Sequence, residues 1–91
     1  MLVVVSYDVA DDRRRLKVMK AMKAFGDRVQ LSVFECNFEH KEMQRMCARL
    51  SRAIKAEEDT VRIYRICENC KTQIRIMGRG VVSEDPELII V

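Results

Sequence analysis

The chain has 91 residues, which is enough for one domain and leaves no room for a second hydrophobic core. Its hydrophobic content is 48%, and no apolar stretch approaches the roughly 20 residues that a membrane span requires. The net charge is only +3, but residues 13–55 carry twelve Lys and Arg against four Asp and Glu. The last eleven residues carry three acids and no base. This distribution indicates either a surface that faces a polyanion or an ordinary solvated helical surface, and composition does not separate the two.

The first expected element is a buried strand over residues 2–8, where apolar and β-branched residues run almost without a break. Asp11 and Asp12 then supply an N-cap and acidic first-turn charge for a helix that runs to about residue 25. The three-residue spacing of apolar side chains predicts the core stripe of this helix. The stripe consists of Leu16, Met19, Met22 and Phe25, with Val18 beside it.

The same helix carries a separate row of basic residues. The row consists of Arg13, Lys17 and Lys20, with Arg14 and Lys23 joining it. Gly26 follows the last apolar residue, at the position where a left-handed C-terminal cap favours glycine. We therefore predict a helix with one apolar and one basic face, capped at Gly26.

Alternating residues over 29–38 predict extended structure, either one long strand or two short ones, because no Gly or Pro decides between them. A second helix is expected over residues 39–56. Its predicted buried face consists of Met43, Met46, Cys47, Leu50 and Ile54. Its basic row consists of Lys41, Arg45, Arg49 and Arg52.

After a polar turn at residues 57–59, alternation predicts a strand over 60–67. A further short strand is expected over residues 72–77, closed by Gly78 and Gly80. Residues 88–91 are apolar and are expected to add a strand to a sheet edge, in this chain or in a partner subunit.

This order of elements predicts an α+β fold, a ferredoxin-like βαββαβ sandwich with an extra C-terminal strand. Residues 1–80 form the expected domain, and residues 81–91 form a C-terminal tail and strand that pairs with the partner subunit. Two amphipathic helices cover only one face of such a sheet. The other face, with Gln30, Ser32 and Tyr64, is therefore expected to be buried in a homodimer.

Cysteine usage fits a reducing compartment. Met1 leads directly into the first strand without the features of a signal peptide, so a cytoplasmic location is expected. Cys36 and Cys47 are interpreted as small apolar groups at core or strand positions. Cys67 and Cys70 form a CxxC motif, but no second CxxC or His pair is present to complete a zinc site. Reduced thiols are the first interpretation, with structural zinc and redox chemistry as alternatives.

The residue that indicates chemistry is Asp8, where an apolar strand ends in a carboxylate. A carboxylate held there on a rigid element suits a metal ligand or an acid–base group. One Asp cannot hold Mg²⁺ alone, but two copies of Asp8 that face each other in a twofold dimer could share one ion. An Asx-type turn or a cap for the following helix is the structural alternative, and spacing alone favours it. We find no Ser, His and Cys arrangement for nucleophilic catalysis and no phosphate-binding glycine loop.

Four segments of the sequence match motifs of a known family. They are VVSYDV at residues 4–9, RLK at 15–17 with the later Gly26, RVQLSVFEC at 28–36 and DTVRIYR at 59–65. The chain resembles the Cas2 family, the smaller of the two core CRISPR adaptation proteins. The resemblance rests on these motifs, on their order along the chain and on the length of the chain.

The resemblance implies a homodimer that sits between two dimers of the CRISPR adaptation integrase and helps to hold double-stranded prespacer DNA. Several family members are described as Mg²⁺-dependent endonucleases on RNA or DNA. For this chain, that implies Asp8 as the metal ligand. It also implies a catalytic neighbourhood made of Tyr7, Arg15, Arg28 and Phe34. Lys17 stands where some relatives have Arg, and it keeps the charge but loses bidentate phosphate contact.

The residues expected to contact nucleic acid are Arg13, Arg14, Arg15, Lys17 and Arg28. Aromatic content is 5% with no Trp, so backbone contacts to a duplex fit better than base stacking. Two hypotheses follow, a dimer that bridges integrase subunits on duplex DNA and a Mg²⁺-dependent nuclease, and one protein can satisfy both. A stand-alone toxin-like ribonuclease of the same fold is the alternative.

Overall fold

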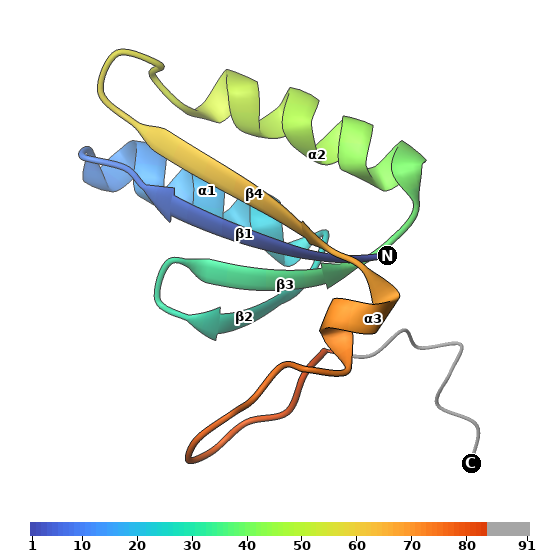
Figure 1. The fold of residues 1–91 in the computed structure, drawn as a ribbon. Coiled ribbons are helices and arrows are strands. Elements are labelled where there is room, and N and C mark those ends of the chain that lie inside the picture. The colour runs from blue at the N-terminus through green and yellow to red at the C-terminus, as the bar shows by residue number, and fades with distance from the viewer. Residues whose placement is uncertain (84–91) are drawn as a thin grey trace.

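The computed structural model describes residues 1–83, which form two layers, a four-stranded sheet and a pair of helices (Figure 1). The elements in chain order are β1 (Leu2–Asp8), α1 (Asp12–Lys23), β2 (Asp27–Gln30), β3 (Val33–Asn37), α2 (His40–Ala53), β4 (Thr60–Ile66) and α3 (Glu68–Lys71). The strand order is β2-β3-β1-β4 and all neighbours are antiparallel. The predicted ferredoxin-like order βαββαβ is confirmed.

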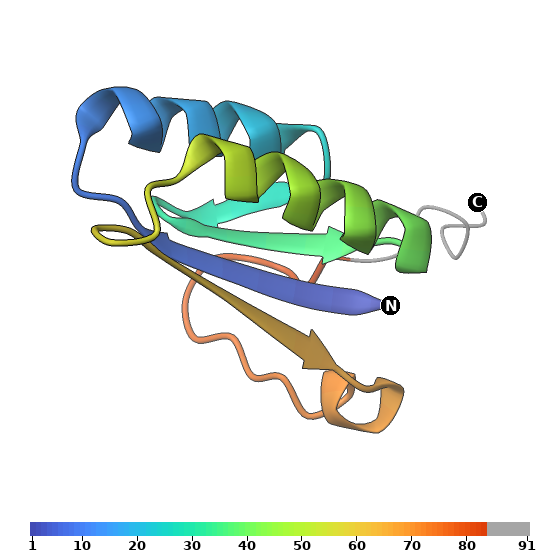
Figure 2. The same cartoon turned by 90° about the horizontal axis from the view of Figure 1, so that it is seen from above.

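Both long helices cover the same face of the sheet, side by side (Figure 2). The core lies between these layers, because alternate residues of β1 point toward the helices. Its fully buried side chains include Val3, Val5, Val18, Met22, Phe34, Cys36 and Met46. Residues 72–83 leave α3 on the side of the sheet away from the helices (Figure 2), and Ser83 contacts β3 there. Within residues 1–83, no helix combines the length and apolar character needed to cross a bilayer.

Helix α1 begins as predicted and buries most of the predicted stripe. Asp11 is the N-cap, and its carboxylate accepts a hydrogen bond of 2.9 Å from the backbone N–H of Arg14. Val18, Ala21 and Met22 are buried, whereas Leu16 is 48% exposed, so its assignment to the core was wrong. Met19 and Phe25 pack against the core as predicted. Three-residue steps fall about 60° short of a full turn, which carries Leu16, two steps before Met22, past the edge of the buried face.

Gly26 is not the left-handed cap that we predicted. Positive φ among the described residues occurs only at Gly78 and Gly80, and the helix is capped at Ala24. Gly26 is needed for a different reason, which is close approach to β3. A Cβ atom there would lie 2.4 Å from the carbonyl oxygen of Glu35 and 2.5 Å from Sγ of Cys36.

The open choice over residues 29–38 resolves into two strands, β2 and β3, joined by a turn at residues 31–32. In α2, Met46 and Leu50 are buried and Met43 and Ile54 pack against the core. Cys47 is exposed, so its placement on the buried face was wrong. One step beyond Met46 turns the helix by about 100°, which carries Cys47 past the edge of the apolar face.

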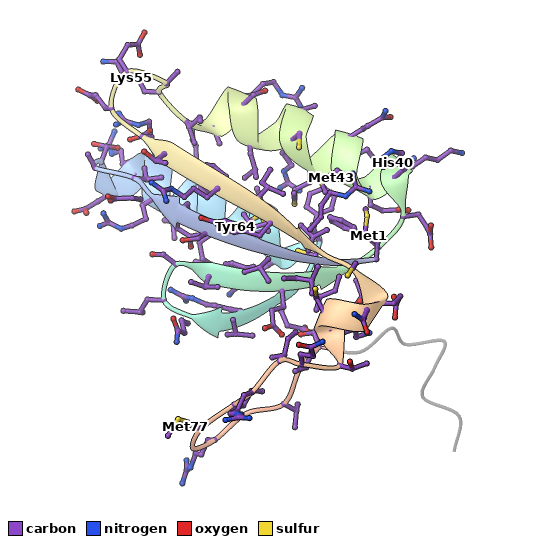
Figure 3. All side chains as sticks on the ribbon, viewed as in Figure 1. Met1, His40, Met43, Lys55, Tyr64 and Met77 are labelled. Atoms are coloured by element: carbon purple, nitrogen blue, oxygen red, sulfur yellow. The ribbon has the colours of Figure 1, made fainter. Side chains whose placement is uncertain are left out.

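The strand expected over residues 72–77 is absent. Residues 68–71 form α3 instead, and residues 72–83 contain no helix or strand. An alternating pattern makes a strand only where a ladder partner is available, and within residues 1–83 this segment has none. Met77, 91% exposed, lies at the tip of the resulting loop (Figure 3). The strand expected at residues 88–91 lies outside the described residues.

Candidate nucleic-acid site at the end of the first strand

The end of β1 presents Tyr7 and Asp8 to opposite sides of the sheet, because successive side chains of a strand alternate. Tyr7 is 5% exposed and belongs to the helix-covered face, together with Val3 and Val5. Asp8 is exposed and pairs with Thr60 at the last rung of the ladder with β4. Its carboxylate therefore belongs to the face that the helices leave open.

Tyr7 and Arg28 meet at the turn between β2 and β3. The carbonyl oxygen of Leu31 accepts hydrogen bonds from Nε and a terminal nitrogen of Arg28, at 3.0 and 2.8 Å. It also accepts a longer one, 3.4 Å, from the hydroxyl of Tyr7. The backbone N–H of Tyr7 donates to the carbonyl of Ser32 at 3.0 Å. These bonds fix the turn and hold the Arg28 guanidinium beside the phenol.

Arg15 approaches the same place from α1. Its guanidinium donates to the carbonyl oxygen of Val9 at 3.0 Å and forms an ion pair with Asp12. Tyr7, Arg15 and Arg28 line one hollow of about 400 Å³ between α1 and the β2–β3 turn. The structure thus brings three of the predicted catalytic neighbours together, with Asp8 on the other face of the strand.

Tyr7 stays a neutral phenol in this setting. Burial raises its pKa above the ordinary value, and the charges of Arg28 and Arg15 offset only part of that rise. Phe34 lies beneath it, fully buried, with ring centroids 6.3 Å apart and an interplanar angle of 27°. Phe34 has no exposed surface, so among the predicted site residues it contacts Tyr7 and offers nothing to a ligand.

Asp8 fits one part of a magnesium site. Its carboxylate is exposed and takes part in no ion pair within residues 1–83, so its oxygens are available to a ligand. The described residues contain no group of three or more His, Cys, Asp or Glu that could hold a metal ion. Mg²⁺ keeps several waters and needs only one or two carboxylates, so Asp8 could supply part of a ligand set but not all of it.

Arg14 is partly buried and is bound to two acidic side chains of the turn before β4. Its guanidinium donates to both carboxylate oxygens of Asp59, at 2.8 and 3.1 Å, and to Glu58 at 2.9 Å. Asp59 also accepts from the backbone N–H groups of Ala10 and Lys55. These contacts tie the start of α1 to the turn before β4, and they leave Arg14 little freedom to reach a phosphate.

Sequence reasoning missed Asp59, which it took as one of three acids in a polar turn. Nothing in the local pattern separates it from Glu57 and Glu58, because the partner that buries it lies 45 residues away. Arg13 and Lys17 are exposed as expected of ligand contacts. Lys17 faces α2, away from the hollow at Tyr7.

The CxxC motif lies at the start of α3 with both thiols exposed. The backbone N–H of Cys70 donates to Sγ of Cys67 at 3.3 Å, and this bond lowers the pKa of the Cys67 thiol. The pKa of Cys70 is raised by its hydrogen bond and charge interaction with Cys67. No third metal ligand lies beside the pair among the described residues.

Comparison with known proteins gives consistent results. Residues 1–74 match the family described as "CRISPR associated protein Cas2". The "CRISPR-associated endoribonuclease Cas2 1" of Chloroflexus aurantiacus is 42% identical over all of this chain and 99% of its own length. The "CRISPR-associated endonuclease Cas2 2" of Thermus thermophilus is 36% identical, over 91% of this chain and 88% of its own length. The crystal structure of Streptococcus pyogenes Cas2 superposes with a TM-score of 0.75 at 32% identity, covering 86% of this chain and all of that one.

Proposed function

This chain belongs to the Cas2 family of CRISPR-associated proteins, and on that premise we propose that it is a homodimer that binds duplex DNA and cleaves phosphodiester bonds with Mg²⁺ at Asp8. The observation that carries the proposal is the end of β1. There an available carboxylate lies one residue from a hollow that gathers Tyr7, Arg15 and Arg28.

The homodimer is supported by the face of the sheet that α1 and α2 leave open. Tyr64 pairs with Val4 across the β1–β4 ladder, and both lie on the face opposite Val3 and Val5. Tyr64 is 49% exposed on β4 (Figure 3). Its strand is also an unpaired edge of the sheet within the described residues. A half-exposed aromatic side chain on an unpaired seven-residue edge favours burial against a second copy.

Pairing of the two open faces would also explain how one carboxylate per chain serves a metal site. Asp8 belongs to the same face as Val4 and Tyr64, so a twofold axis across that face brings the two copies of Asp8 toward each other. Mg²⁺ held there supplies Lewis-acid activation and a water of lowered pKa. The dimer would thus offer two Asp8 carboxylates to one ion, where a single chain offers one.

The remaining residues of the site position the substrate. Arg15 and Arg28 offer guanidinium groups to a phosphodiester and to the negative charge that develops during cleavage. The Tyr7 hydroxyl stays a neutral phenol, and its long bond to the Leu31 carbonyl would be exchanged for one to the substrate. Phe34 and the Leu31 carbonyl hold Tyr7 and Arg28 in place.

We further propose that the dimer bridges subunits of the CRISPR adaptation integrase on double-stranded prespacer DNA. The exposed cations of α1 and α2 support duplex binding, since a rigid row of Lys and Arg follows a phosphate backbone with little sequence preference. A stand-alone toxin-like ribonuclease would not need the integrase. Co-purification from cells that carry both proteins separates these alternatives. The bridging role predicts that the integrase is recovered together with this chain, and a stand-alone ribonuclease predicts that it is not.

The nuclease proposal is tested by incubating wild type, Asp8→Asn and Glu57→Gln with labelled RNA and with duplex DNA, in Mg²⁺ or in chelator. Glu57 is exposed and lies outside the site, so its variant controls for loss of one surface charge. We expect cleavage by wild type and Glu57→Gln in Mg²⁺ alone, and none by Asp8→Asn. Cleavage that persists in Asp8→Asn or in chelator would remove Asp8 and Mg²⁺ from the reaction.

A further inference from the structure

Four cations face one another across the outer side of the helix pair. Lys17 and Lys20 come from α1, and Arg49 and Arg52 come from α2. They surround an open groove of about 420 Å³ whose floor is formed by Ala21 and Ala53. We call this feature the α1–α2 basic groove; Figure 2 shows the two helices that form it lying side by side.

Three neighbouring basic residues, Arg14, Arg15 and Lys55, form ion pairs within residues 1–83, and the four groove cations do not. Arg14 pairs with Asp59 and Glu58, Arg15 with Asp12, and Lys55 with Glu58. Within residues 1–83, no carboxylate lines the groove and none forms an ion pair with its four cations. Like charges held together on two rigid helices repel, and an external anion relieves that repulsion.

The groove lies on the far side of α1 from the hollow at Tyr7. Each residue turns a helix by about 100°, so Arg15 and Met19 project toward β2 while Lys17 and Lys20 project toward α2. The two surfaces share no residue. A ligand in the groove therefore does not occupy the hollow of the same protomer.

We propose that the α1–α2 basic groove holds the sugar–phosphate backbone of a nucleic-acid duplex. This deepens the proposed duplex binding, on which it rests, by assigning that binding to one groove and separating it from the site at Asp8. The holding of DNA and its cleavage are then properties of different surfaces.

The lining of the groove selects this ligand over others. A protein partner would be anchored by buried aromatic or large aliphatic side chains, and the only apolar side chains here are two alanines. A single strand would use aromatic platforms for its bases, and no aromatic residue lines the groove. Two small floor residues between four cations leave room for a phosphate backbone to approach the helices closely.

The test compares two double variants with equal changes in charge. Lys20→Glu with Arg49→Glu reverses two cations of the groove. Lys23→Glu with Lys41→Glu reverses two exposed cations of the same helices outside it. Both pairs lower the net charge from +3 by the same amount. Duplex DNA affinity is measured by fluorescence anisotropy over a fourfold range of salt, about 50 to about 200 mM.

We expect the groove pair to weaken duplex binding by at least about tenfold and to reduce the slope of log affinity against log salt by about 1.8, the share of two phosphate contacts. The control pair should leave the slope close to that of wild type. A milder pair, Lys20→Gln with Arg49→Gln, removes the same contacts without adding repulsion and should lower the slope equally. Melting curves show that each variant is folded.

Equal affinity and slope in the groove and control pairs, with wild type binding the duplex, would overturn the groove assignment and leave the proposed function standing. Failure of wild type to bind the duplex at all would overturn both. A groove pair that keeps its duplex affinity but loses binding to polyglutamate would contradict the proposal in favour of an acidic protein partner.

Discussion

At the scale of single residues, the Asp59 side chain accepts more hydrogen bonds than any other side chain within residues 1–83. Its carboxylate accepts two hydrogen bonds from Arg14 and one each from the backbone N–H groups of Ala10 and Lys55. These partners belong to the start of α1, the turn after β1 and the turn before β4. The Asp59 side chain thus links these three segments at the end of the sheet where Asp8 lies.

Asp59→Asn is expected to lower the melting temperature at about pH 7, and the loss should shrink in acid. The hydrogen bonds and charge of Arg14 hold the pKa of Asp59 well below its ordinary value. A carboxyl with a lowered folded-state pKa stabilises the fold above its unfolded pKa of about 3.9, and that contribution is lost as pH falls through the folded pKa. Thermal unfolding of both proteins between about pH 2 and pH 7 measures the effect.

Glu58→Gln serves as the control, since Glu58 is half exposed and its ion pair with Arg14 is screened by solvent. It should shift the melting temperature little at any pH. A deficit in Asp59→Asn that stays constant across the pH range would show that the ionised carboxylate is not the source of stability.

The four cysteines should differ sharply in reactivity, because the thiolate is the reacting form. Burial, reinforced by the charges of Asp27 and Glu35, raises the pKa of Cys36 to about 11. The hydrogen bond from the Cys70 backbone lowers the pKa of exposed Cys67. Limited alkylation with iodoacetamide, followed by peptide mass spectrometry, should modify Cys67 first and Cys36 last. Early labelling of Cys36 in the folded protein would contradict its place in the core.

At the scale of elements, the apolar pattern identified the strands and helices better than the faces they bury. Continuous apolar residues predicted β1, alternation predicted β4, and Asp11 marked the start of α1. The pattern could not show that Leu16 and Cys47 lie beyond the edges of the buried faces, because that depends on how each helix is rotated on the sheet. It also could not exclude a strand at residues 72–77. That segment forms no strand because, within residues 1–83, no neighbouring strand is available to pair with it.

The rotation of α1 is tested by comparing Met22→Ala with Leu16→Ala. Met22 is fully buried, and its truncation should cost about 2–5 kcal/mol of unfolding free energy. Leu16 is 48% exposed, so its truncation should cost less than about 1 kcal/mol. Urea denaturation followed by circular dichroism measures both. Equal losses would return Leu16 to the core stripe, where the three-residue spacing placed it.

Gly26→Ala tests the contact between the end of α1 and β3. The new Cβ would collide with the backbone oxygen of Glu35, which cannot move without displacing the strand. We expect a loss of about 1–3 kcal/mol, as for other overpacked sites. Gly78→Ala is the comparison, because no atom lies within 4 Å of a Cβ there and the cost comes only from its φ of +87°. In urea, Gly26→Ala should be the less stable variant. The reverse order would remove the close-approach explanation.

At the scale of the whole molecule, one chain supplies only part of the site that we propose. Its sequence motifs name Tyr7, Asp8, Arg15 and Arg28, and the fold gathers Tyr7, Arg15 and Arg28 around one hollow. The sequence could not show that Asp8 and Tyr7 leave the strand on opposite faces with different neighbours. Nor could it show that Arg14 is bound to Asp59, since that pair joins distant parts of the chain. We propose that a second copy of the chain, through its own Asp8, completes the metal site.

The measurement that tests this claim most directly is the nuclease activity of mixed dimers. Wild-type and Asp8→Ala chains are unfolded, mixed in equal amounts and refolded, so that dimers form at random. If both copies of Asp8 hold one ion, only pure wild-type dimers cleave. Activity then falls to about one quarter of that of wild type at the same total concentration. Activity of about one half would show that each Asp8 works independently and would contradict the shared site.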